Sequence, residues 1–72
     1  MNERQQAHIA YFLERLKYWE AERPGVDKWQ PRLLAARDAD NTYPLRTEEE
    51  GSEVFVYLTK LDKEGQPGEP PN

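Results

Sequence analysis

The sequence predicts a small, mainly α-helical domain over 1–63: an antiparallel helical hairpin followed by a short C-terminal β-strand or β-hairpin. Apolar residues recur at three- and four-residue spacing in the first half of the chain, which indicates helices. A run of β-branched and aromatic residues at 53–61 favours a strand. An all-α, three-helix arrangement is the alternative.

The first element is an amphipathic helix over 2–22. Asn2 is its expected N-cap, Gln5 is the capping-box partner three residues later, and Pro24-Gly25 ends the helix. At about 100° per residue, six side chains share the sector that the helix should bury. They are Gln5, Ile9, Phe12, Leu13, Leu16 and Trp19.

The second element is a shorter helix over 28–39. Asp27 is its expected N-cap, and Pro31 is tolerated because backbone N–H groups in the first turn have no partner inside the helix. Since the connection between the two helices is short, we expect them to lie antiparallel.

The third element is a β segment within 42–61. We expect a strand at 53–61, because Val-Phe-Val-Tyr loses side-chain freedom in a helix, and an edge strand at 42–47 as its mate. In the alternative, Ser52 caps a third helix. Four residues would then share one face of that helix: Val54, Phe55, Leu58 and Leu61.

The chain is short of material for a core. It has 72 residues, of which 36% are hydrophobic, with no cysteine and one histidine, so neither a disulfide nor a structural zinc site is expected to staple it. Association with another chain is the remaining way to stabilise so small a core, and the unpaired edge of the predicted strand favours a homodimer. Residues 64–72 are rich in proline and glycine and are expected to form a disordered tail.

Charge is unevenly distributed along the chain. Residues 1–37 carry seven basic and five acidic side chains, whereas 38–72 carry three and nine. No basic surface of the kind that phosphate contacts need is indicated, which argues against nucleic acid as a partner. No signal peptide or membrane-spanning run is present, so a cytoplasmic location without membrane contact is expected.

The inventory of reactive side chains argues against an enzyme. A single His8, a single Ser52 and no cysteine supply no nucleophile with a base, and no cofactor is expected. Oxygen-bearing residues in 38–49 follow the spacing of a calcium loop, but Tyr43 and Pro44 occupy the sharp turn where glycine is needed. We therefore expect no metal site.

Two features suggest contact with another protein. Ala7, Tyr11 and Tyr18 lie opposite the core sector of the first helix, where tyrosines present rigid, amphipathic surface. The plainer interpretation is that one tyrosine covers a neighbouring helix and the other lies flat on the surface. The acidic run of Glu48, Glu49 and Glu50 would face basic groups on a partner, or else only solvent.

The function expected from these features is a small non-enzymatic interaction module. It would act as an inhibitor or adaptor, of the kind encoded by phages and mobile elements, by occupying a surface on a larger protein. The alternatives are a small nucleic-acid-associated regulator of the antitoxin kind and a small subunit of a larger complex.

Overall fold

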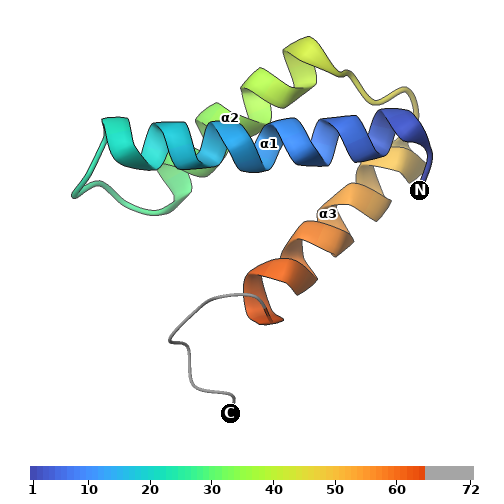
Figure 1. Cartoon of the computed structure of the whole chain (residues 1–72). Helices are drawn as coiled ribbons and strands as arrows, with labels where there is room; N and C mark the ends of the chain where they lie inside the picture. The colour runs from blue at the N-terminus through green and yellow to red at the C-terminus, as the bar shows by residue number, and fades with distance from the viewer. Residues whose placement is uncertain (65–72) are drawn as a thin grey trace.

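A computed structural model describes residues 1–64 and places them in three helices, with no strand among these residues. The helices are α1 (Glu3–Glu22), α2 (Trp29–Thr42) and α3 (Glu48–Glu64), drawn from blue to orange in Figure 1. The mainly α prediction is confirmed, and the three-helix alternative is the arrangement found. Of the predicted tail, Glu64 ends α3, and 65–72 lie outside the described residues.

The start of α1 follows the prediction from its sequence. The Oδ1 of Asn2 accepts the backbone N–H of Gln5 at 2.8 Å, and the Oε1 of Gln5 accepts that of Asn2 at 2.9 Å, which completes the capping box. At the other end, Gly25 has a φ of +86°, a left-handed conformation that glycine adopts without steric penalty. This residue turns the chain back toward α2.

The second helix begins without the predicted cap and is longer than expected. The N-cap is Lys28 and makes no side-chain cap, whereas the carboxylate of Asp27 accepts the indole N–H of Trp29 at 3.2 Å. The helix continues to Thr42, three residues past the predicted end, because nothing in Asp40-Asn41-Thr42 breaks it before Tyr43.

The core lies where α1 and α2 cross as an antiparallel hairpin (Figure 1). Phe12 of α1 packs against Ala35 and Ala39 of α2, and both alanines are fully buried. Small side chains four residues apart form one face of α2, which lets the two helix backbones approach closely. The hairpin is the compact part of the molecule.

The predicted β segment is wrong, because 48–64 is helical. Its expected mate at 42–47 is the end of α2 and the connection, which leaves no strand to pair with. Thr47, rather than Ser52, caps α3: its Oγ1 accepts the N–H of Glu50 at 3.1 Å. The strand preference of Val54–Leu58 reflects a need for side-chain packing more than an intrinsic backbone preference, and here a helix meets it in part.

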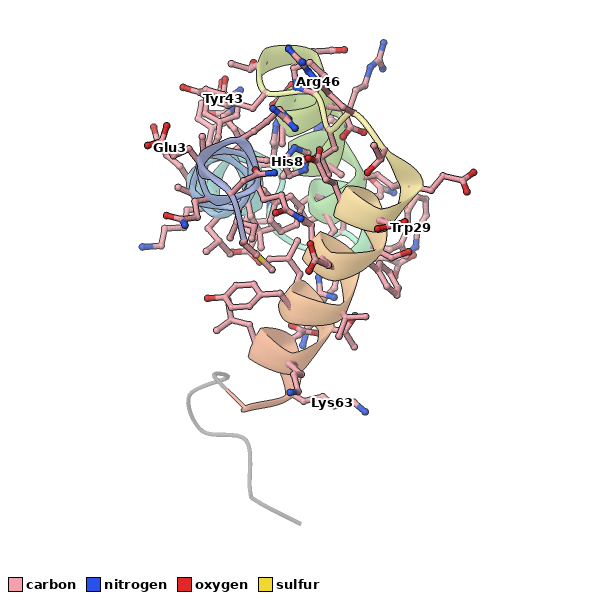
Figure 2. All side chains as sticks on the ribbon, turned by 90° about the vertical axis from the view of Figure 1, so that its right-hand side faces the viewer. Glu3, His8, Trp29, Tyr43, Arg46 and Lys63 are labelled. Atoms are coloured by element: carbon pink, nitrogen blue, oxygen red, sulfur yellow. The ribbon has the colours of Figure 1, made fainter. Side chains whose placement is uncertain are left out.

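The third helix diverges from the hairpin. It begins beside the N-terminal end of α1 and its C-terminal end points away from α1 and α2 (Figures 1 and 2). Within the described residues, only Val54 of α3 is buried. None of the three helices is long and apolar enough to cross a membrane.

Candidate functional site

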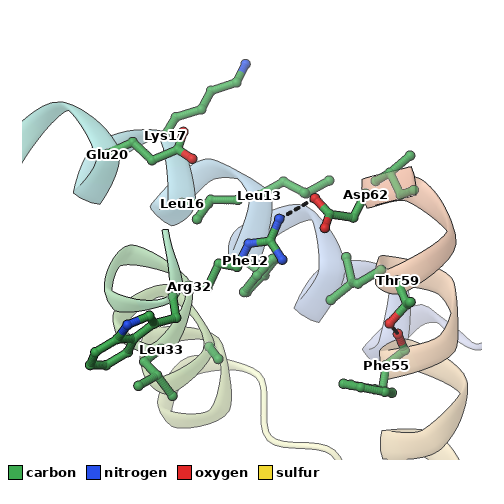
Figure 3. Close-up of a pocket in the computed structure, with 14 residues that line it drawn as sticks. Phe12, Leu13, Leu16, Lys17, Glu20, Arg32, Leu33, Phe55, Thr59 and Asp62 are labelled. Carbon is green, nitrogen blue, oxygen red and sulfur yellow. Dashed lines mark hydrogen bonds and ion pairs between the residues drawn. The ribbon is translucent and has the colours of Figure 1, made fainter. Parts of the chain in front are cut away.

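An apolar groove lies between the hairpin and α3. It measures about 850 Å³, and most of its lining is aliphatic or aromatic (Figure 3). The main apolar contributors are Phe12, Leu13 and Leu16 from α1, Leu33 from α2, and Phe55 and Leu58 from α3. The groove exists because α3 packs against α1 near its own start and then diverges from the hairpin (Figure 1).

One ion pair spans the groove. The guanidinium of Arg32 in α2 contacts the carboxylate of Asp62 near the end of α3 (Figure 3). Both side chains remain about 40% exposed, so water screens the pair and it stabilises the position of α3 only modestly. Lys17 and Glu20 of α1 also border the groove.

A polar junction fastens the start of α3 to the start of α1; we define it as Asn2, Arg4, Gln5, Glu50 and Glu53. Gln5 is 2% exposed, and its Nε2 donates to the carboxylate of Glu53 at 2.7 Å and to the carbonyl of Glu50 at 3.3 Å. The same side chain therefore caps α1 and holds α3.

Glu50 is the charged centre of the junction. Its carboxylate accepts hydrogen bonds from the side chain of Arg4, the backbone N–H of Arg46 at 2.9 Å and the amide of Asn2 at 2.8 Å. These donors stabilise the ionised form and lower the pKa of Glu50 from 4.5 to about 2, with Arg4 contributing most. Glu50 stays ionised at any physiological pH.

A second surface is the Tyr18 patch, which we define as Arg15, Tyr18 and Trp19 of α1 with Asp38 of α2. The Arg15 guanidinium lies 4.2 Å from the centre of the Tyr18 ring, and the rings of Tyr18 and Trp19 meet edge to face at 5.0 Å. Tyr18 is 44% exposed. No member of the patch lines the groove.

Asp38 organises this patch from the neighbouring helix. One of its oxygens accepts both the indole N–H of Trp19 at 2.8 Å and the Nε–H of Arg15 at 2.9 Å. The Trp19 and Arg15 hydrogen bonds lower the pKa of Asp38, and the bond to Asp38 raises the pKa of Arg15. Both groups therefore stay charged at neutral pH, and the arginine and tryptophan are held in one orientation.

The predicted contact residues are distributed over different environments. Ala7 is half-buried, and Tyr11 is half-buried with its ring 5.6 Å from that of Tyr43. Tyr18 belongs to the exposed patch, so the two tyrosines contact different partners. Glu48 and Glu49 are exposed in the first turn of α3, whereas the carboxylate of Glu50 is engaged in the junction.

The single histidine, His8, connects two helices, and the aspartates of the calcium-like segment lie within a helix. The buried imidazole of His8 donates from Nδ1 to the carbonyl of Tyr43 at 2.9 Å, which links α1 to the end of α2. Asp38 and Asp40 lie in a helix, not in a loop where their oxygens would converge. Among residues 1–64, no group of three or more histidine, aspartate or glutamate side chains is placed to hold a metal ion.

The groove was not anticipated from the sequence. A signal for it is present in Val54–Leu58, five apolar residues in succession, since such a run faces every side of a helix.

No protein-family model matches the chain, and comparisons with curated proteins and with solved structures give no match either.

Proposed function

We propose that this chain is a non-enzymatic protein-binding module that occupies a surface on a larger protein, as an inhibitor or adaptor, and that it works as a homodimer. The observation that supports the binding role most directly is the Tyr18 patch. Tryptophan, tyrosine and arginine are the residue types most enriched where binding energy concentrates in protein interfaces, and here one of each stands together.

The patch is also ordered before any partner arrives. Asp38 restrains Arg15 and Trp19 through hydrogen bonds, and the guanidinium in turn lies against the Tyr18 ring. Freezing a long side chain on binding costs about 0.5 to 1.5 kcal/mol, and a side chain already held in place avoids most of that loss. The arrangement therefore favours a rigid contact over an adaptable one.

The acidic first turn of α3 supports a role in steering. Glu48 and Glu49 are exposed, and their charges add to the net charge of −4. Exposed charges at the rim of an interface mainly raise the association rate with an oppositely charged surface. The larger partner is accordingly expected to carry net positive charge, which attracts the acidic start of α3 at long range, although this turn lies at the opposite end of α1 from Tyr18.

Photo-crosslinking tests this proposal. A benzophenone amino acid replaces Tyr18 in one sample and Glu3 in another, and each chain is irradiated in native lysate of the source organism. Glu3 is the matched control because it is exposed on the same helix, about 22 Å along the axis from Tyr18.

The expected result is an adduct to one larger protein from position 18 that is absent from position 3. Excess unlabelled chain should suppress this adduct, and unlabelled Tyr18→Ala chain should suppress it at least tenfold less well. Identical adduct profiles from the two positions would refute the assignment of the patch as a contact surface.

A further inference from the structure

Helix α3 is apolar around its whole circumference at its middle. Successive residues of a helix point about 100° apart, so Val54, Phe55, Val56 and Tyr57 face four different sides. A helix that is apolar on all sides offers more than one surface for packing, and of these four residues only Phe55 borders the groove. Here Val54 is 4% exposed, while Phe55, Val56 and Tyr57 are 71%, 56% and 42% exposed.

The groove beside α3 is equally unfilled. Phe55 projects on its α3 side, and Trp29 and Leu33, 55% and 60% exposed, lie on its α2 side. Residues 65–72 contain only glycine, glutamine, proline, glutamate and asparagine, so this part of the chain has no aliphatic or aromatic side chain to place there. Residues 65–72 therefore supply no occupant, whereas a second copy of the chain does.

We propose that the occupant is α3 of a second copy, inserted antiparallel to α3 of the first, so that each copy fills the groove of the other around a two-fold axis. The two α3 helices would then form a central layer between two hairpins. This inference supplies a location for the homodimer in the proposed function. It uses residues outside the Tyr18 patch, so either proposal can fail alone.

Charge complementarity favours a second copy in this orientation. In the first turn of α3, Glu48 and Glu49 are exposed, whereas Glu50 is engaged in the junction. Near the end of the helix, Lys60 and Lys63 are exposed, and Asp62 between them is paired with Arg32. Antiparallel pairing sets the two exposed glutamates of each helix beside the two lysines of the other, and it also opposes the two helix dipoles. A parallel arrangement would bring like charges together.

Two large rings at the groove are available for a contact between copies. Trp29 and Phe55 offer on the order of 250 Å² of exposed ring surface per copy, and Leu33 adds an exposed aliphatic side chain beside them.

Gly51 is consistent with this docking. It lies one turn before Phe55 in α3, and a Cβ at this position would meet no atom within 4 Å. The chain itself therefore gives no steric reason for a residue that weakens a helix. A glycine on the groove side allows a docked helix to approach the backbone of α3.

Light scattering coupled to size exclusion tests the proposal. At micromolar concentration the unmodified chain should have a measured mass of twice the 8.5 kDa of one chain. Phe55→Asp should weaken the dimer at least 30-fold, because it buries a charge in the groove. Val56→Asp is the matched control: the neighbouring residue is also exposed but points away from the groove, so this variant should stay dimeric.

A second measurement is needed because unfolding of the Phe55→Asp variant would also abolish the dimer. The chain has no cysteine, so single-cysteine variants report contacts directly. Phe55→Cys should form a disulfide-linked dimer under mild oxidation, and Val56→Cys should not. A monomeric unmodified chain up to millimolar concentration, or loss of the dimer in Val56→Asp but not in Phe55→Asp, would overturn the proposal. So would an adduct from a photo-crosslinker at position 55 to an unrelated protein only.

Discussion

Replacing Gln5 with alanine should release α3 while leaving the hairpin folded. Gln5 supplies two hydrogen bonds to α3, one of them to the carboxylate of Glu53. A neutral hydrogen bond contributes about 0.5 to 1.5 kcal/mol and a charged one about 1.5 to 3 kcal/mol. Because Glu53 is exposed and regains water, we take about 2 kcal/mol for the pair.

The assay is amide hydrogen exchange followed by mass spectrometry. A loss of about 2 kcal/mol should speed exchange throughout α3 roughly 30-fold, since each 1.4 kcal/mol is a factor of ten. Amides of α2 should change less than twofold, and only the first turn of α1 should also accelerate, because its capping box is lost. The measurement belongs in the Phe55→Asp background, where self-association cannot protect α3.

Gln6→Ala is the matched control. Gln6 is the adjacent residue, is exposed, and its side-chain amide donates to the carbonyl of Met1 at 3.0 Å. Its replacement should leave α3 exchange unchanged. Equal acceleration in α2 and α3 of the Gln5→Ala variant would show that the three helices open as one unit, and the view of α3 as a separately fastened helix would then be wrong.

Two further variants test the core and the junction. Phe12→Ala removes a ring that is only 8% exposed from the hairpin core, so it should lower the free energy of unfolding by about 3 to 5 kcal/mol. Leu33 is 60% exposed, so Leu33→Ala should lower it by less than about 1 kcal/mol. Urea denaturation of dilute samples measures both. The pKa of Glu50 is about 2 in the folded chain and near 4.5 when unfolded, so its stabilisation is complete above pH 4.5 and is lost as the pH falls toward 2. Glu50→Gln should therefore melt below the unmodified chain at pH 6, and the difference should disappear near pH 2; a constant difference would contradict this account.

Local signals in the sequence were sufficient to predict the helical hairpin. The capping box of Asn2 and Gln5 and the turn at Gly25 involve residues close in the chain, and the structure confirms both. The predicted buried sector of α1 is buried at Gln5, Ile9 and Phe12, and only half-buried at Leu13, Leu16 and Trp19. Leu13, Leu16 and Trp19 stay partly exposed because α3 stands away from the middle of α1.

The identity of the third element depended on distant contacts. Val54–Leu58 satisfies a strand and a fully covered helix equally well, and the choice is made by what lies beside it. Among residues 1–64 no second strand is available, while Gln5 and Arg4, more than forty residues earlier, hold Glu50 and Glu53 at the start of a helix. Likewise Tyr18 was identified from its position on α1, but its ordering through Asp38 of α2 is a tertiary property.

The position of the polar junction also suggests an order of events during folding. The hairpin joins residues such as Trp19 and Asp38, 19 apart, whereas Gln5 reaches Glu53 across 48 positions. Closing a long loop costs more chain entropy than closing a short one, so we expect the hairpin to close first and α3 to dock last.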